Sequence, residues 1–143
     1  MFMGEFQHAL DDKGRLTMPG KFRDHLNGTF VMTRGLDGCI FVYPAAEWET
    51  IERKLKSLPM TRADARSFVR MFFSGASECE LDKQGRVLVP SVLREHAGLQ
   101  KDCVVLGVSN RVEVWSQERW TPYANVAESQ FAELAEQLTD LEF

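Results

Sequence analysis

The stretch Leu10-Asp11-Asp12-Lys13-Gly14-Arg15-Leu16-Thr17-Met18-Pro19 returns with few changes as Leu81-Asp82-Lys83-Gln84-Gly85-Arg86-Val87-Leu88-Val89-Pro90. Asp82 follows Asp11 by 71 positions. The same offset relates Arg23 to Arg94 and His25 to His96, and one inserted residue later Trp48 matches Trp120. A self-match at a fixed offset indicates that the chain is an internal duplication.

Size and composition restrict the class of protein. The chain has 143 residues, of which 44% are hydrophobic and 27% are charged, which is typical of a soluble globular protein. We expect one domain, or two small modules that share a core. No apolar run approaches the roughly eighteen residues of a membrane-spanning helix, and the stretch 1–5 does not resemble a secretion signal. Cys39, Cys79 and Cys103 are widely spaced, so we expect reduced, buried thiols and a cytoplasmic location.

Charge is unevenly distributed along the chain. The formal net charge is −4, but the stretch 120–143 holds five acidic residues and no lysine or arginine. Basic residues gather around the repeated turns: Lys13, Arg15, Lys21 and Arg23 at the first, and Lys83, Arg86 and Arg94 at the second. Because the local field attracts phosphate, the negative total does not exclude a nucleic-acid partner.

The first half, residues 5–47, is predicted to be a β-rich module. Its expected elements are a strand at 2–10, a type I turn at 11–14, a return strand at 16–18, a short helix at 21–26 ended by Asn27-Gly28, and a β-hairpin of 30–33 with 39–43. We expect the strand at 2–10 to pair with the segment that follows the turn. In the turn, Asp11 bonds the backbone ahead of it and Gly14 supplies a positive φ.

Residues 48–75 are predicted to form a helical connector. In its first helix, which opens at Pro44, Trp48, Ile51, Leu55 and Leu58 share one face. Thr61 with Asp64 resembles a capping box for the second helix. That helix is expected to bury Ala65, Phe68, Val69, Phe72 and Phe73 and to end at Gly75.

A basic stripe of Arg62, Arg66 and Arg70 lies on the other face of this second helix. Solvation of the face is one interpretation. Contact with nucleic acid and contact with the acidic residues of a neighbouring subunit are the others.

The second half, residues 76–119, repeats the first module, and residues 120–143 form an acidic tail. The expected elements are a strand at 77–81, a turn at 82–85, a strand at 86–89, a helix at 90–97 stopped by Gly98, and a hairpin of 103–107 with 111–115. Pro122 is expected to break or restart the helix that begins at Ser116. An amphipathic helix at 123–141 follows, with Val126, Phe131, Leu134 and Leu138 at helical spacing.

Catalytic motifs are not apparent. The sequence has no metalloprotease spacing, nucleophile elbow, phosphate loop or dinucleotide-binding glycine pattern. His25 and His96 recur at equivalent positions, but each is more simply explained as packing or hydrogen bonding at the end of its short helix. We therefore expect no enzyme activity, no cofactor, no metal site and no small-molecule substrate.

The repeated Asp-x-x-Gly-Arg turn allows two interpretations. Asp11 with Arg15, and Asp82 with Arg86, could pair only to hold the turns, which on a surface contributes a few tenths of a kcal/mol. Alternatively, the turns hold Arg15 and Arg86 out toward phosphate oxygens or guanine edges, which match the planar fork of a guanidinium. We prefer the second interpretation, because an exposed arginine contributes no core packing that would explain its return.

These residues resemble the MraZ family of bacterial transcriptional regulators, whose hallmark is a repeated Asp-x-x-x-Arg. The resemblance also includes the opening Met-Phe-x-Gly-Glu and the stretch 73–79, and it spans roughly residues 1–120. It implies an α+β fold, in which two tandem SpoVT/AbrB-type swapped-hairpin modules form a pseudo-twofold, barrel-like unit with flanking helices and a C-terminal helix.

The resemblance further implies a closed homo-oligomeric ring that binds double-stranded DNA. Members bind direct repeats upstream of the division and cell-wall gene cluster, including their own gene, and generally repress it, so a nucleoid-associated location follows. Carried onto this chain, Arg15 and Arg86 are the principal DNA contacts, Lys13 and Lys83 support them, and Asp11, Gly14, Asp82 and Gly85 hold the loops. Gln84 replaces the lysine found at position 13, so the two loops should contribute unequally.

A rival interpretation is an oligomeric scaffold whose basic loops bind an acidic partner, such as tails like that of this chain.

Overall fold

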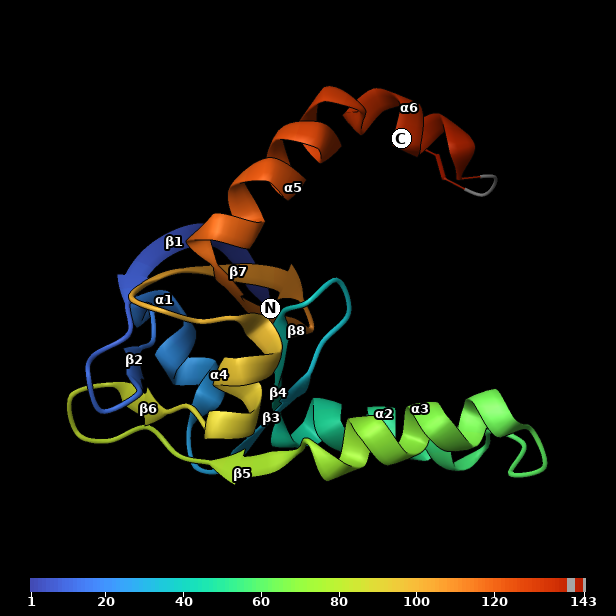
Figure 1. Ribbon diagram of the computed structural model, residues 1–143, viewed down its shortest axis with the longest axis horizontal. Helices are drawn as coiled ribbons and strands as arrows, with labels where there is room; N and C mark the ends of the chain where they lie inside the picture. The colour runs from blue at the N-terminus through green and yellow to red at the C-terminus, as the bar shows by residue number, and fades with distance from the viewer. Residues whose placement is uncertain (139–140, 143) are drawn as a thin grey trace.

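The computed structural model describes residues 1–138, 141 and 142, and it has the expected mixed α+β architecture (Figure 1). In chain order its elements are β1 (Phe2–Ala9), β2 (Arg15–Thr17), α1 (Gly20–Arg23), the 3-10 turn η1 (Asp24–Leu26), β3 (Phe30–Arg34), β4 (Ile40–Pro44), α2 (Ala45–Lys56), α3 (Ala63–Ser74), β5 (Ser77–Cys79), β6 (Arg86–Leu88), α4 (Ser91–Ala97), β7 (Asp102–Ser109), β8 (Arg111–Ser116), α5 (Gln117–Ser129) and α6 (Phe131–Gln137).

The strands form a six-stranded sheet in the order β1-β7-β8-β4-β3-β5 and a two-stranded sheet of β2 and β6. The expected pairing of the first strand with the segment beyond its turn is wrong. All eight residues of β1 pair antiparallel with β7, and a single bridge from Leu10 to Leu16 remains of the expected pair. The physical reason is the length of the partner strand: β7 can pair with every residue of β1, whereas β2 has only three residues.

The pairing register is symmetric under exchange of the two halves. In the large sheet β4 meets β8 with Phe41 opposite Glu113, and in the small sheet Leu16 lies opposite Val87; each pair joins equivalent positions of the repeat. The pair β1–β7 corresponds in the same way to β5–β3. Each half therefore gives its first strand to the hairpin of the other half.

The expected closure into a barrel-like unit is not found. The large sheet has two edges, β1 and β5, and over the described residues no pairing joins them. The two-stranded sheet instead lies across one face of the large sheet with α1 and α4 (Figure 1). Between these layers lies the main core, formed on both sides by equivalent residues: Leu16, Met18 and Phe22 from the first half, and Val87, Val89 and Leu93 from the second.

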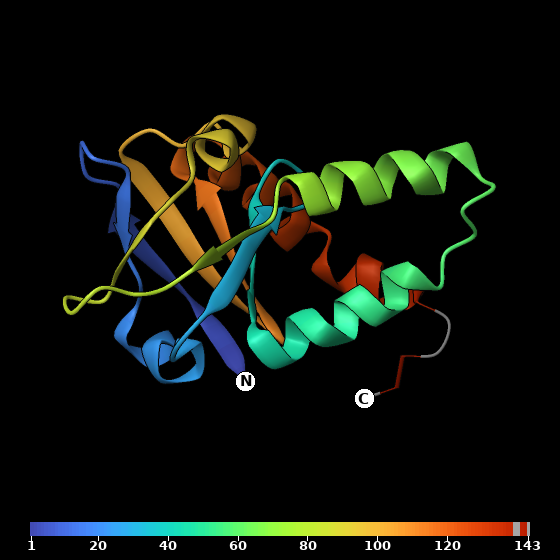
Figure 2. The same cartoon turned by 90° about the horizontal axis from the view of Figure 1, so that it is seen from below.

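A second apolar cluster covers the other side of the large sheet. Tyr43, Trp115 and Phe72 are buried there, with Trp48 and Trp120 packed against them. Trp48 stacks on Phe72 with ring centroids 5.6 Å apart, which fixes α2 and α3 against the sheet. Beyond this cluster, the α2–α3 pair projects from the body of the molecule (Figure 2), and the α5–α6 segment projects separately (Figure 1).

Several details of these helices correct the sequence predictions. Thr61 caps nothing, because α3 has Arg62 at its N-cap position and no side-chain cap. Of the five apolar residues expected to be buried in α3, only Phe72 is buried, and Phe68 is 39% exposed. Pro122 does not break its helix: α5 runs through it, and the interruption falls at Gln130. The acidic helix expected at 123–141 is thus two helices, and Asp140 lies outside the described residues.

Within the part of the chain that the structure describes, no helix is both long enough and apolar enough to cross a membrane.

Candidate nucleic-acid interface

The first repeated turn is held by the carboxylate of Asp11. Its Oδ1 accepts hydrogen bonds from the backbone N–H groups of Lys13 and Arg15, at 2.9 and 2.8 Å. Its Oδ2 accepts one from Nε of Arg15 at 2.8 Å. Gly14 donates to the Asp11 carbonyl at 3.1 Å and has a φ of 82°, as the sequence predicts for a glycine after a type I turn.

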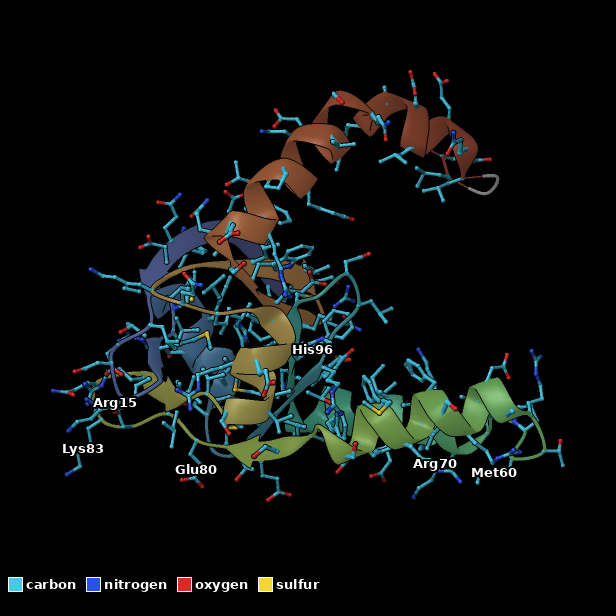
Figure 3. The ribbon with its side chains drawn as sticks, in the orientation of Figure 1. Arg15, Met60, Arg70, Glu80, Lys83 and His96 are labelled. Atoms are coloured by element: carbon cyan, nitrogen blue, oxygen red, sulfur yellow. The ribbon has the colours of Figure 1, made fainter. Side chains whose placement is uncertain are left out.

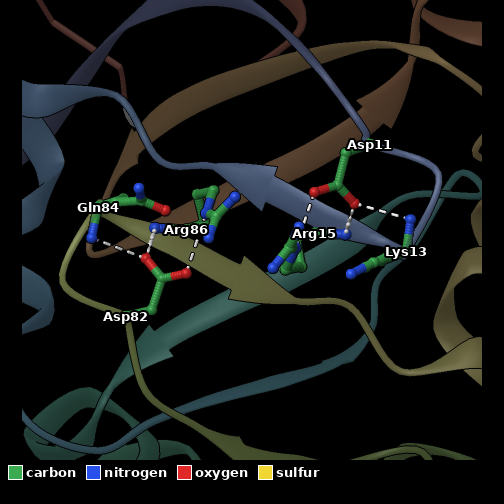
Figure 4. Close-up of polar contacts among 6 residues, drawn as sticks. All are labelled: Asp11, Lys13, Arg15, Asp82, Gln84 and Arg86. Atoms are coloured by element: carbon green, nitrogen blue, oxygen red, sulfur yellow. Dashed lines mark hydrogen bonds and ion pairs between the residues drawn. The ribbon is translucent and has the colours of Figure 1, made fainter.

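The second turn repeats this geometry (Figure 4). Asp82 Oδ1 accepts from the backbone N–H groups of Gln84 and Arg86, both at 2.9 Å, and Oδ2 accepts from Nε of Arg86 at 3.0 Å. Gly85 has a φ of 76°. These contacts lower the pKa of both aspartates below the ordinary value, chiefly through the backbone N–H of the arginine in each turn. The carboxylates are therefore charged at neutral pH and keep the turns closed.

The turns orient Arg15 and Arg86 but use only some of their hydrogen-bond donors. Each uses the Nε edge of its guanidinium for the aspartate, and the side chains remain 32% and 27% exposed. Within the described residues, the terminal nitrogens of these two arginines donate no hydrogen bond to protein. The ion pair fixes each turn, and the outer edge of each guanidinium stays open to solvent.

The two arginines share one outward face of the β2–β6 ribbon. Leu16 and Val87 point into the core, so the alternation of a strand directs Arg15 and Arg86 to the opposite side, with Thr17 and Leu88 beside them. Figure 4 shows both guanidiniums lying between the two turns. Lys13 and Lys83 are exposed on the turns themselves, and Arg15 and Lys83 lie at the same end of the molecule (Figure 3).

A second pair of arginines supports the turns, each arginine supporting the turn of the other half. Sequence patterns did not predict that this pair belongs to the site. Arg23 follows the first turn but packs beneath Gly85 of the second, while Arg94 packs beneath Gly14 of the first. Nε of Arg23 donates to the Met18 carbonyl at 2.9 Å. The recurrence of both arginines at the repeat offset was visible in the sequence, but their exchange between halves follows from strand pairing that the sequence does not reveal.

The remaining candidate residues lie away from this ribbon. His96 Nε2 lies 3.3 Å from the Gly35 carbonyl, and His25 packs edge-on against Phe2, so both histidines have the expected structural roles. All three cysteines are free and buried, as predicted. Among the described residues, no group of three or more His, Cys, Asp or Glu side chains could hold a metal ion.

Comparison with known proteins identifies the family of the chain. The family model described as "MraZ protein, putative antitoxin-like" matches the chain twice, over residues 1–71 and 72–142. The chain belongs to the MraZ family. Proteins named transcriptional regulator MraZ from Desulforamulus reducens, Natranaerobius thermophilus and Heliobacterium modesticaldum are 62%, 61% and 61% identical to it, over 99% of both chains in each comparison. The MraZ relatives are transcriptional regulators and not enzymes, and such a family implies binding to DNA.

Proposed function

We propose that this protein is a sequence-specific repressor that binds direct repeats upstream of the division and cell-wall gene cluster, including its own gene. In this proposal residues 5–47 and 76–119 are SpoVT/AbrB-type modules, 48–75 connects them, and 120–143 is the acidic tail. The protein acts in the cytoplasm, associated with the nucleoid, as a closed homo-oligomeric ring without a small-molecule ligand.

The observation that carries the proposal is the outward face of the β2–β6 ribbon. A two-stranded ribbon fits the major groove of B-DNA, and a guanidinium can donate two parallel bonds to guanine O6 and N7 or to a phosphate. Arg15 and Arg86 have their outer donors free for such bonds, and the aspartate on the inner edge limits their rotation. Preorganisation of this kind lowers the entropic cost of binding. Lys13 and Lys83 add sequence-independent attraction to the backbone.

A ring accounts for the small size of this surface. One ribbon with two arginines and two lysines neutralises few phosphates, which is too little for tight binding at physiological salt. Repetition of the ribbon around an assembly multiplies the contacts, and linkage adds affinity without new chemistry. Direct repeats in DNA suit a head-to-tail arrangement of subunits.

The proposal is tested by gel-shift and anisotropy titration against the upstream region of the protein's own gene. The double variant Arg15→Ala/Arg86→Ala should lose specific binding while keeping its mass and melting temperature. Lys101→Ala, which removes a positive charge from an exposed position outside the ribbon and outside both helical segments, is the control and should bind normally. Retention of specific binding by the ribbon variant would contradict the proposal.

A scaffold function is the alternative, with the ribbon bound to an acidic protein. For DNA binding, log affinity should fall linearly with log salt at a slope set by several phosphates. A flat dependence would favour the scaffold.

A further inference from the structure

Two helical arms extend from the body of the molecule. We call α2 and α3 with their connecting loop the hairpin arm, and α5 with α6 the tail arm. Figures 1 and 2 show both arms on the side of the molecule away from the repeated turns, and Figure 1 shows open space between them. No hydrogen bond or ion pair joins the two arms of one chain within the described residues. Each arm is therefore free to contact another molecule.

The tail arm carries exposed apolar side chains, of which Tyr123 packs in part on Trp115, with ring centroids 5.0 Å apart. Its large apolar side chains are exposed as follows: Tyr123 45%, Val126 57%, Phe131 76%, Leu134 44% and Leu138 60%. Neither α5 nor α6 has a buried residue. α6 has only seven residues, and isolated helices shorter than about 12 residues are marginal in water. The tail arm therefore needs a partner surface to stabilise its helical state.

The hairpin arm has a smaller uncovered apolar surface near its tip. Met60, Phe68 and Met71 are 67%, 39% and 53% exposed, and Phe68 and Met71 stand three residues apart on one side of α3. Beside Phe68 lies an open pocket of about 280 Å³, lined by Leu58, Pro59, Arg62, Asp64, Ala65 and Phe68. It offers space for an apolar side chain from outside.

The arms carry opposite charge. The hairpin arm, residues 45–74, contains six basic and four acidic residues, with all six basic residues in the stretch 53–70, whereas the tail arm, residues 117–137, contains four acids and one basic residue. In α6, Glu133 and Glu136 fall on the side away from Phe131 and Leu134, so their charge stays in solvent and acts on a partner at longer range. Charges in that position steer association and select the partner.

We propose that the tail arm of one copy of this chain docks on the hairpin arm of the next copy, burying Phe131 and Leu134 against the surface around Phe68 and Met71. The occupant is a second copy because the complementary charge and the complementary apolar surface both occur on this chain, on arms that do not meet within it. A contact between two different surfaces is heterologous, and it closes into a ring when the rotation permits. This inference deepens the ring of the proposed function and rests on it.

The test begins with the mass of the full chain, measured by sedimentation velocity. Wild type should assemble at micromolar concentration. Phe131→Ser/Leu134→Ser should raise the concentration for half-dissociation by about tenfold or more, because the variant loses the central apolar contact. Met3→Ser/Leu36→Ser is the matched control, since it removes apolar side chains that are 66% and 60% exposed elsewhere, and it should assemble as wild type does.

The second variant, Phe68→Ser/Met71→Ser, damages the opposite surface and should also be monomeric at the concentration at which wild type assembles. An equimolar mixture with the tail variant then decides the geometry. One intact tail and one intact hairpin arm remain in such a mixture, so it should form a one-to-one dimer and nothing larger.

The inference would be overturned by a wild type that is monomeric at micromolar concentration, by a tail variant that assembles at the same concentration as wild type, or by a mixture that stays monomeric. Assembly of the hairpin variant alone would also overturn it, in favour of a tail-to-tail contact. Circular dichroism melting of each variant identifies any loss of fold. The proposed DNA function fails separately, because Arg15→Ala/Arg86→Ala leaves both arms intact and should keep wild-type mass.

Discussion

Arg94 lies directly beneath Gly14: a Cβ atom placed on that glycine would stand 2.6 Å from Nη1 of the arginine. The equivalent pair is closer still, with the same atom on Gly85 standing 2.4 Å from Cζ of Arg23. Each turn therefore rests on a guanidinium supplied by the other half of the chain. The contacts that support the repeated turns are therefore also contacts between the two halves of the chain.

The contact predicts that Gly85→Ala destabilises the protein more than Gly28→Ala. Both glycines have positive φ, 76° and 70°, so both substitutions carry the same backbone strain. Only Gly85 has a neighbour that must move, because nothing lies within 4 Å of a Cβ at Gly28. We expect Gly85→Ala to cost about 1 kcal/mol more in urea unfolding, because Arg23 must move and lose its hydrogen bond to the Met18 carbonyl. Equal losses of unfolding free energy for Gly85→Ala and Gly28→Ala would show that the Arg23 side chain moves aside at no measurable cost.

The unequal turns predict unequal salt dependence. Lys13→Ala removes an exposed charge beside Arg15, whereas Gln84→Ala at the equivalent position removes none. If Lys13 contacts a phosphate, its loss should reduce the slope of log affinity against log salt by about 0.9, and the Gln84 variant should leave the slope unchanged. Identical slopes for the two variants would exclude the phosphate contact.

The aspartates predict loosening of the turns in acid. Because the folded-state pKa of Asp11 and Asp82 lies below the ordinary 3.8, their stabilisation is complete above that value. It is lost as the pH falls through the lowered pKa. Hydrogen exchange at the backbone N–H groups of Lys13 and Gln84 should therefore show protection that holds near neutral pH and disappears in strong acid. In Asp11→Asn/Asp82→Asn the protection should be weak at every pH.

The cysteines predict slow thiol chemistry in the native protein. Burial raises the pKa of Cys39 to about 12 and that of Cys103 to about 11, and it also raises the pKa of Cys79. Each thiol is thus protonated and shielded at neutral pH, and the thiolate is the reactive form. A disulfide reagent should label none of them before unfolding and all of them in urea. Rapid native labelling of one cysteine would locate a local opening.

Local features of the fold could be predicted from the sequence because local chemistry determines them. In both turns the aspartate accepts the predicted hydrogen bond from the backbone ahead of it. An aspartate at the first position and a glycine at the fourth leave the backbone few other conformations. Both hairpins and the short helix after each turn were also predicted. The DNA contacts of Arg15 and Arg86 stay predictions.

Partner choice between distant segments could not be predicted. The alternation in β1 indicates a strand but does not distinguish β7 from β2 as its neighbour, and the crossed placement of Arg23 and Arg94 depends on that choice. The burial predicted for Phe68 was wrong for a different reason. An apolar helix face predicts that an apolar surface covers it, but it does not predict where that surface lies. Pro122 was misjudged because α5 continues through it at the cost of one backbone hydrogen bond, with Trp120 and Tyr123 packed against Trp115 on either side of the proline.

The exchange of first strands between the halves makes each half structurally incomplete. Residues 1–71 alone would leave β1 without β7 and β3 without β5. Residues 72–142 alone would leave β7 without β1 and β5 without β3. A protein of half this length would exist only as an obligate pair, with stability that depends on concentration. Joining the halves into one polypeptide makes that association intramolecular, so the folded state survives dilution, and the two turns are free to diverge as they have at Lys13 and Gln84.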